Sequence, residues 1–356
     1  MNASLLRLLI CCALLATAAA HAQPAPLPPP ADDLPYVAKP GDTMIGIARR
    51  LLIDGRLPAV QRALQQHNGF ESEKDADRIG PGRTVRIPSN WLRSENARVV
   101  VASASGEIRS PAPLKAGAAL APGQEIGTGK TGQVVLKLTD GSTLTLKPGS
   151  TMSMERSAKT PLSATPDTVF NLTSGRAETE VVKRTGSGAR FEIRTPVAVA
   201  AVRGTRFRVS AAEGGACMTS EVLEGRVEVA DTGKLGRVSV DKDFGTRTNA
   251  GAAPVEPRRL LEAPRLWGGN WLARKPGASM RMLTLKGAVR YRVAISQGRE
   301  RGGPVVVEWD TPSVDLVLPE LSNGEYFITV RGIDDLALEG RESGSQLTVQ
   351  IGAPQS

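Results

Sequence analysis

Few side chains in this 356-residue sequence have the types and spacing that catalysis requires. A thiol nucleophile needs a histidine base close by, but His67 lies far upstream of Cys217. Two histidines in the whole chain also cannot supply the ligand cluster of a zinc enzyme. Lys130-Thr131-Gly132 resembles one motif of penicillin-binding active sites, but the accompanying Ser-x-x-Lys motif is absent from the sequence. A phosphate-binding loop at the same place would need a glycine at position 124, where the sequence has Gln124. The sequence therefore predicts no catalytic residue, no metal site and no cofactor.

The N-terminus has the order of features that a signal peptidase reads. Arg7 stands in an apolar run that ends in Ala20-His21-Ala22, and a proline-rich segment follows. We expect a signal peptide at residues 1–22, cleavage after Ala22, and a location in the periplasm or cell envelope. A retained signal anchor and a lipoprotein are the alternatives. Cleavage would leave Cys217 as the one cysteine, so an internal disulfide is not expected.

Composition narrows the class of partner. The formal net charge is +9, but only 4% of residues are aromatic and no recognition-helix or base-stacking pattern appears, so nucleic acid is not expected. The basic excess favours loose attraction to envelope polymers, lipid phosphates and peptide carboxylates, or solubility alone. No segment after the signal peptide is apolar enough for a membrane span, so none is expected in the mature chain.

Hydrophobic periodicity divides the chain into modules, and the predicted fold class is a mainly β multidomain protein. Helical periodicity is confined to one small strand-helix-helix-strand module, and everything after it has the pattern of short strands separated by turn residues. The expected segments are a signal peptide at 1–22, an extended proline-rich linker at 23–34, the first module at 35–92, an all-β module at 95–250 and a β-sandwich at 264–352.

The first module carries two turn motifs that border a possible groove. Pro40-Gly41-Asp42-Thr43 follows a short strand, and Gly80-Pro81-Gly82 precedes a strand that ends in Pro88. With its strand-helix-helix-strand order, this segment resembles the lysin-motif (LysM) family, which binds N-acetylglucosamine-containing glycans such as peptidoglycan. The resemblance implies a sugar groove between the two loops. The residues that it nominates are Gly41, Asp42, Thr43, Met44, Ile79 and Gly80.

The same residues also have a purely structural explanation. Glycine and aspartate build turns, and Asp42 or Thr43 can cap the first helix. Glycan binding and turn chemistry are therefore competing hypotheses for this motif.

The middle module alternates apolar and polar residues with period two. Leucines on both sides of Asp140-Gly141-Ser142 share a buried face only if the hairpin loop has an odd number of residues. We therefore expect a three-residue loop with Gly141 at positive φ, pairing Leu138 with Leu144 and Leu136 with Leu146. Further strands are expected at 169–172, 177–182, 191–195, 205–209 and 222–229. In the strand at 205–209, Arg206 and Arg208 are expected to face water.

Several motifs of this module occur in the order found in one known domain. They are Asp140-Gly141-Ser142, Leu172-Thr173-Ser174-Gly175-Arg176, Val202-Arg203-Gly204-Thr205-x-Phe207-x-Val209 and Val222-Leu223-Glu224-Gly225-x-Val227. The module resembles the FecR domain, an all-β periplasmic domain of regulators that pass a signal from an outer-membrane receptor to a sigma factor. The resemblance implies the fold and a role in protein contact. The cytoplasmic helical segment and membrane span of those regulators are not expected here.

The last module has six expected strands at 280–285, 289–296, 305–309, 314–318, 326–330 and 346–351. Their spacing is typical of an antiparallel sandwich. Tyr326 follows a corner, Leu321 to Glu325, and resembles the corner tyrosine of fibronectin type III-like domains. We expect its hydroxyl to make a corner-stabilising hydrogen bond.

The sequence leaves three hypotheses for function. The leading one is a non-catalytic envelope protein that docks on peptidoglycan through the LysM-like module and presents its two β modules to an envelope partner, either a protein or a polysaccharide. The alternative is a periplasmic signalling regulator related to FecR-type sensors. The third is a cryptic glycan hydrolase, which would need a carboxylate pair that the sequence does not reveal.

Overall fold

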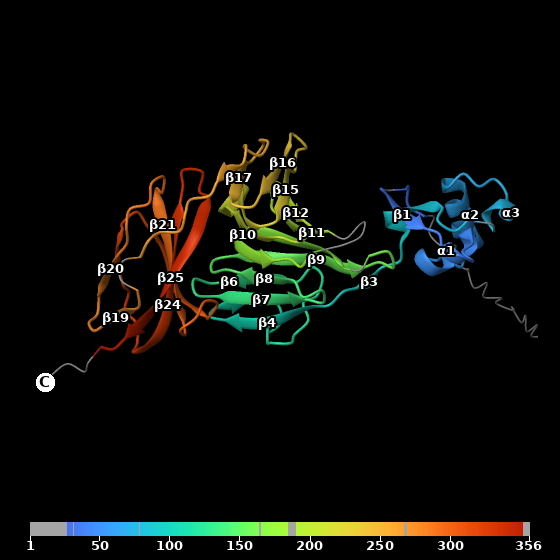
Figure 1. Ribbon diagram of the computed structural model, residues 1–356. Coiled ribbons are helices and arrows are strands. Elements are labelled where there is room, and N and C mark those ends of the chain that lie inside the picture. Colours follow the sequence, from blue (N-terminus) through green and yellow to red (C-terminus); the bar gives the residue numbers. More distant parts are fainter. Residues whose placement is uncertain are drawn as a thin grey trace, which may run out of the picture.

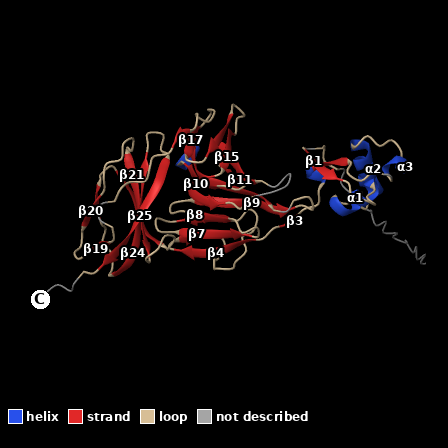
Figure 2. Cartoon of the chain, viewed as in Figure 1, coloured by secondary structure: helices blue, strands red, loops and turns tan. Residues whose placement is uncertain are grey.

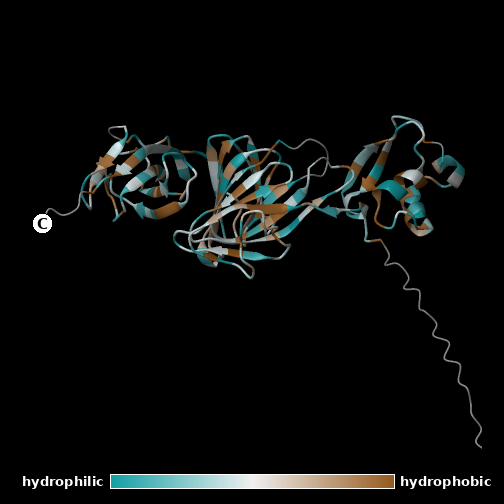
Figure 3. Ribbon diagram, turned by 90° about the horizontal axis from the view of Figure 1, so that it is seen from below, coloured by the Kyte–Doolittle hydropathy of each residue, from teal (hydrophilic) through white to brown (hydrophobic). Residues whose placement is uncertain are grey.

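The computed structural model describes residues 27–30, 32–77, 79–163, 165–183, 190–266 and 269–351. Three bodies follow one another in a row, with helices confined almost wholly to the first (Figures 1 and 2). Seen from below, the strands of the two larger bodies alternate between polar and apolar residues (Figure 3). The described chain contains no helix long and apolar enough to cross a membrane. The expected signal peptide at 1–22 lies outside the described residues.

The first module has the predicted strand-helix-helix-strand order, with one further helical turn. Its elements are β1 (Asp33–Val37), α1 (Met44–Leu51), α2 (Pro58–His67), α3 (Glu73–Ala76), β2 (Thr84–Pro88) and the 3-10 turn η1 (Ser89–Trp91). β1 and β2 form an antiparallel pair, and both helices pack on it around Ile47, Leu64 and Ile87. Pro58 begins α2, where a missing amide hydrogen costs nothing.

The end of the proline-rich segment is not the free spacer that its composition predicts. The indole Nε1 of Trp91 donates to the Pro28 carbonyl at 2.8 Å, and Asn90 Nδ2 donates to the Pro29 carbonyl at 2.7 Å. Leu27 packs on the core of the first module, and β1 begins at Asp33. Residues 27–30 are thus held against the first module, because side chains of the η1 turn donate hydrogen bonds to their proline carbonyls.

The middle module consists of two sheets that share one strand. The first sheet contains β3 (Glu95–Asn96), β5 (Ile108–Arg109), β6 (Glu125–Thr128), β9 (Thr151–Lys159), β11 (Phe191–Arg194), β12 (Ala198–Val202), β15 (Arg226–Asp231) and β16 (Arg237–Asp241). The second contains β4 (Val99–Ser105), β7 (Gln133–Leu138), β8 (Thr143–Leu146), β13 (Arg206–Ala211), β14 (Cys217–Glu224), β17 (Phe244–Asn249) and β18 (Arg258–Arg259), with the 3-10 turn η2 (Glu213–Gly215) before β14. Phe170, Phe191 and Phe207 meet between the sheets, with ring centroids 5.7 and 6.3 Å apart.

The shared strand is β10 (Asp167–Glu180), which corrects the prediction of separate strands at 169–172 and 177–182. Its first half pairs with β9 and β11, and its second half with β8 and β13. Thr173-Ser174-Gly175 has the composition of a turn, but it forms a bulge with Gly175 at φ 87°. A bulge bends a strand without ending it. Gly225, at φ 84°, likewise carries the chain from β14 in one sheet to β15 in the other.

The β7–β8 hairpin confirms the odd loop and corrects its register. Gly141 has φ 90°, and the Leu138 amide bonds to the Ser142 carbonyl across a three-residue loop. Leu136 pairs with Leu144 rather than with Leu146. A shift by two residues keeps every leucine on the same face, so burial alone could not choose between the registers. The carboxylate of Asp140 settles the choice locally, because it accepts a hydrogen bond from the Ser142 amide at 2.9 Å.

The last module is a sandwich of two unequal sheets over one core. The larger sheet has the order β19 (Trp271–Ala273), β25 (Glu339–Val349), β24 (Gly324–Ile333), β21 (Arg290–Gln297) and β22 (Val305–Thr311), and the smaller pairs β20 (Ser279–Arg281) with β23 (Asp315–Val317). Met280 and Leu316 of the small sheet bury against Val293 and Ile328 of the large one. The Tyr326 hydroxyl donates to the Ser322 carbonyl at 2.9 Å, which confirms the predicted corner hydrogen bond.

The bulge at Gly175 generates a stability prediction. A Cβ at this position would lie 2.4 Å from Ser150 Cα and would have to adopt φ 87°. We expect Gly175→Ala to lower the free energy of unfolding by about 2 kcal/mol or more in urea titrations, because left-handed strain alone costs about 1–2 kcal/mol. The control is Gly149→Ala, which has the same strain at φ 67° but no atom within 4 Å of the new Cβ. Equal losses for both variants would show that the contact with Ser150 is unimportant.

Candidate functional site

The structure brings the two predicted glycan-binding loops side by side. Ala38 exchanges backbone hydrogen bonds with the second loop: its amide donates to the Arg83 carbonyl and its carbonyl accepts from the Gly82 amide, both at 2.8 Å. Gly41 and Gly80 are exposed at this junction. The nominated residues thus share one surface region.

Asp42 and Thr43 already have structural partners. The Asp42 carboxylate accepts hydrogen bonds from the Tyr36 hydroxyl at 2.6 Å, the Lys39 amide at 2.8 Å and Arg50 at 2.9 Å. Burial alone would raise the pKa of Asp42, but these donors hold it below its ordinary value. The Thr43 hydroxyl accepts from the Gly46 amide and caps α1. Both side chains fulfil the turn and cap roles that compete with glycan binding.

Met44 and Ile79 belong to the core of the first module. Met44 is fully buried and Ile79 is 5% exposed. Of the six nominated residues, Gly41 and Gly80 are exposed and Thr43 is partly exposed, and glycan binding there remains a prediction.

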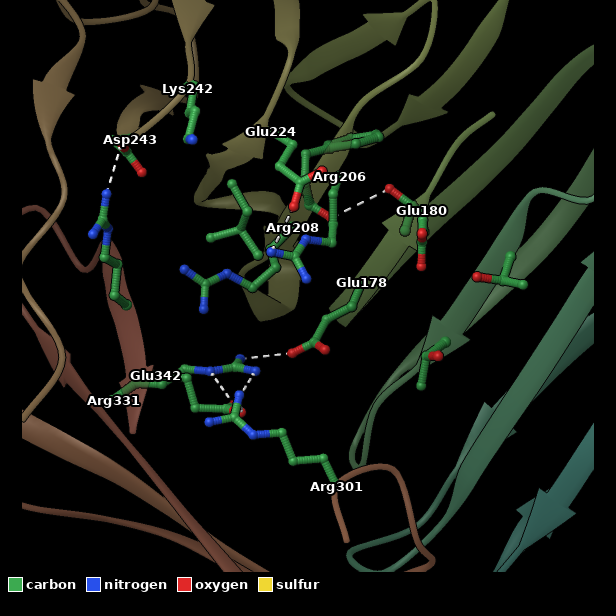
Figure 4. Close-up of a pocket in the computed structure, with 16 residues that line it drawn as sticks. Glu178, Glu180, Arg206, Arg208, Glu224, Lys242, Asp243, Arg301, Arg331 and Glu342 are labelled. Carbon is green, nitrogen blue, oxygen red and sulfur yellow. Dashed lines mark hydrogen bonds and ion pairs between the residues drawn. The ribbon is translucent and has the colours of Figure 1, made fainter. Parts of the chain in front are cut away.

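A second candidate site, which no sequence motif indicates, lies where the middle module meets the sandwich. The outer faces of the second sheet and of the large sandwich sheet are polar, and they pack against each other (Figures 1 and 4). On the middle module this face carries Arg176, Glu178, Arg208 and Glu221, and on the sandwich it carries Arg292, Glu308, Arg331, Glu339 and Glu342. We call this set the interdomain charge cluster.

Several ion pairs cross the boundary, and two of them lie at neighbouring outward positions of β10. Arg176 on β10 contacts Glu308 on β22, and each side chain is only 12% exposed. Two positions along β10, Glu178 contacts Arg331 on β24 at 2.6 Å. Because alternate strand residues point to the same face, β10 presents a cation and an anion together to the sandwich. On the sandwich, Glu308 and Arg331 carry the opposite charges.

Glu339 is the centre of the interdomain charge cluster. Its carboxylate lies within 4 Å of four guanidinium groups, those of Arg176, Arg208, Arg292 and Arg331. Burial on its own would raise the pKa of Glu339, but attraction from Arg292, Arg176 and Arg331 outweighs it and holds the pKa well below the usual range. A carboxylate buried this deeply requires such compensation.

Arg208 corrects the prediction of a solvated arginine. It is 4% exposed, and its guanidinium donates to the Glu339 and Gly340 carbonyls at 2.5 and 2.9 Å. Arg206, two positions earlier, is exposed as predicted and pairs with Glu224 at 2.9 Å. The alternation of β13 was correctly inferred, but its outer face is covered by another domain.

Glu221 is the unfavourable member of the interdomain charge cluster. It is fully buried, and the guanidinium of Arg208 lies 3.7 Å from its carboxylate. The same guanidinium also pairs with Glu339. Burial, together with repulsion from Glu339, raises the pKa of Glu221 to about 7 despite attraction from Arg208.

Two hollows flank the interdomain charge cluster. One, of about 520 Å³, opens between β8, β10 and β13 on one side and Arg301, Arg331 and Arg341 on the other (Figure 4). The other, of about 500 Å³, is lined by residues that include Arg109, Arg290, Arg292 and Cys217. His67 lies in the first module, where it contacts Asp33 at 2.7 Å, so it is not the base of a Cys217 thiol.

Sequence comparison identifies one part of this arrangement. The FecR family model, described as FecR protein, matches residues 124–228. Residues 124–228 form a FecR domain. Arg176, Glu178, Arg208 and Glu221, the middle-module members of the interdomain charge cluster, all fall within this FecR domain.

Other comparisons are weaker. Two structures of a candidate anti-sigma factor from Parabacteroides distasonis align at 21% and 23% identity, each with a TM-score of 0.31, over 38% of this chain. The chain spans 59% of the length of those neighbours. The extracellular domain of a candidate one-component system from B. thetaiotaomicron aligns at 8% identity and TM-score 0.18, over 61% of this chain and 36% of that one. These TM-scores are too low to establish a shared fold. No curated protein matches in sequence.

The raised pKa of Glu221 predicts how stability depends on pH. The unfolded chain releases this proton near pH 4.5, whereas the folded chain keeps it until about pH 7, so ionisation of Glu221 lowers the free energy of unfolding as pH rises between these values. We expect Glu221→Gln to gain stability over the parent chain, by about 2–3 kcal/mol, as pH increases from 5 to 8, because a difference of one in pKa corresponds to about 1.4 kcal/mol.

Urea unfolding at several pH values measures this effect. Glu228→Gln, an exposed change on β15, is the matched control and should track the parent chain. The lowered pKa values of Glu178 and Glu339 act below pH 4.5, outside this window. A stability difference between Glu221→Gln and the parent that does not grow with pH would contradict the assignment.

Proposed function

We propose that this chain is a non-catalytic envelope regulator whose FecR domain and sandwich work as one signalling unit. The observation that carries the proposal is the interdomain charge cluster: the polar face of the FecR domain is covered by the chain's own sandwich. This contact contains hydrogen-bonded ion pairs, with Arg176–Glu308 and Glu178–Arg331 crossing it.

An interface of this kind suits a relay. Regulators commonly signal by rotating or separating domains about an interface whose salt bridges rearrange. Removing one partner of a buried pair costs about 3–5 kcal/mol, because the other charge is left unpaired. A partner protein that supplies competing charges would therefore shift the equilibrium from the docked arrangement of the two domains toward an open one.

The test is a charge exchange at one crossing pair. We expect Arg176→Glu, which sets a carboxylate against Glu308 and Glu339, to separate the two domains and enlarge the particle in small-angle scattering. In the encoding bacterium, a strain that lacks the chain should show an altered transcript profile, which the parent chain restores and Arg176→Glu does not.

The double variant Arg176→Glu with Glu308→Arg is the control, because it restores opposite charges at the same place. It should recover both the compact particle and the transcript profile. A deletion strain with an unchanged transcript profile would rule out the signalling role.

Docking on peptidoglycan is the second candidate function. It is supported by the close approach of the two loops of the first module and by the open surface at Gly41 and Gly80. In this proposal the first module holds the regulator on the wall while the other two domains meet a partner.

A substitution at Gly80 tests this docking without disturbing the fold. A Cβ there meets no atom within 4 Å, so Gly80→Glu should fold normally while it obstructs the junction of the loops. We expect this variant, and a chain lacking residues 34–93, to sediment with purified peptidoglycan less than the parent. Ala59→Glu, on an exposed position of α2, adds the same charge elsewhere and should sediment normally. Unchanged sedimentation of the truncated chain would exclude docking through this module.

A further inference from the structure

The larger hollow beside the interdomain charge cluster has the features of a binding site. Its volume is about 520 Å³, which matches the size of small-molecule pockets. Its lining includes the short side chains of Thr143 and Thr145 on β8 and the long side chains of Arg301 and Arg331 from the sandwich.

Polar groups without partners gather around this hollow. The hydroxyls of Thr143 and Thr145 make no hydrogen bond with any described residue, although both line the hollow. Lys242, in the turn between β16 and β17, makes no ion pair within the described chain, and neither does the carboxylate of Glu180 at the end of β10. In Figure 4, Lys242 and Glu180 stand on opposite sides of the Arg206–Glu224 pair.

The remaining charged groups of the lining already have partners. Arg341 pairs with Asp243 at 2.7 Å, Arg301 with Glu342 at 2.7 Å and Arg206 with Glu224 at 2.9 Å. A ligand that binds only the groups without a partner would leave all of these ion pairs intact. Those groups are one ammonium, one carboxylate and two hydroxyls, so the complementary ligand carries an anion, a cation and further hydrogen-bonding groups.

We propose that this hollow binds a small zwitterion of the amino acid or short peptide class. Lys242 pairs with the ligand carboxylate, Glu180 pairs with the ligand ammonium, and the threonine hydroxyls bond to its polar backbone. A ligand held this way bonds to the middle module, in a hollow that Arg301 and Arg331 of the sandwich also line, so the complete site exists only when the two domains are docked. Its binding therefore favours the docked arrangement of the two domains.

Ligand binding in this hollow is independent of the proposed signalling role, because it needs no protein partner and can be measured on the isolated chain. The chain from Gln23 onward is titrated with free alanine, alanyl-alanine, N-acetyl-alanyl-alanine and alanyl-alanine amide in ligand-observed NMR. We expect the zwitterionic probes to bind more tightly than the acetylated probe, which lacks the cation, and than the amide, which lacks the anion.

Two variants assign the contacts. Both side chains are exposed, so Lys242→Ala should weaken binding of alanyl-alanine by up to about fivefold, and Glu180→Gln by a similar factor, the upper value for one exposed ion pair. Lys159→Ala and Glu228→Gln remove exposed charges on β9 and β15, away from the hollow, and should leave binding unchanged. Urea unfolding checks that all four variants are folded.

Three outcomes would overturn the proposal. They are no binding of any probe at tens of millimolar, equal binding of zwitterionic and singly charged probes, and binding that neither Lys242→Ala nor Glu180→Gln weakens. A failed transcript test with intact zwitterion binding would refute the signalling role and leave this site standing.

Discussion

The arrangement of the two β domains depends on one buried carboxylate, that of Glu339. It sits at the start of β25 and draws four arginines from both domains toward one point. Moving a charge of this kind out of water is costly, and only the surrounding guanidinium groups and hydrogen bonds offset the loss. The domains are therefore oriented by electrostatic matching, which fixes geometry strictly but adds less stability than an apolar contact of the same size.

Much of the fold could be predicted from the sequence because it follows local rules. The turn glycines, the helix caps and the period-two alternation located most elements of all three modules. The predictions of strand ends and strand register failed where the same residues are compatible with two backbone arrangements. Gly175 bends β10 instead of ending it, and the β7–β8 register shifts by two residues while every leucine keeps its face.

The candidate interdomain site could not be predicted in the same way. Arg176, Glu178 and Arg208 occupy the outward positions of their strands, and an outward charged residue has the same sequence pattern whether water or another domain covers it. Their burial depends on contacts with residues more than a hundred positions away, such as Glu308 and Glu339. The motif at Gly41 to Met44 was visible in sequence for the opposite reason, since turns and caps are local.

The continuity of β10 gives the molecule a mechanical axis. One unbroken backbone runs from Asp167, paired beside β9, to Glu180 at the sandwich boundary, and β9 in turn pairs with β3 just after the first module. Tension applied between the first module and the sandwich would load these paired strands rather than a flexible connection. A chain anchored at one end and held by a partner at the other would thus transmit force directly to Arg176 and Glu178.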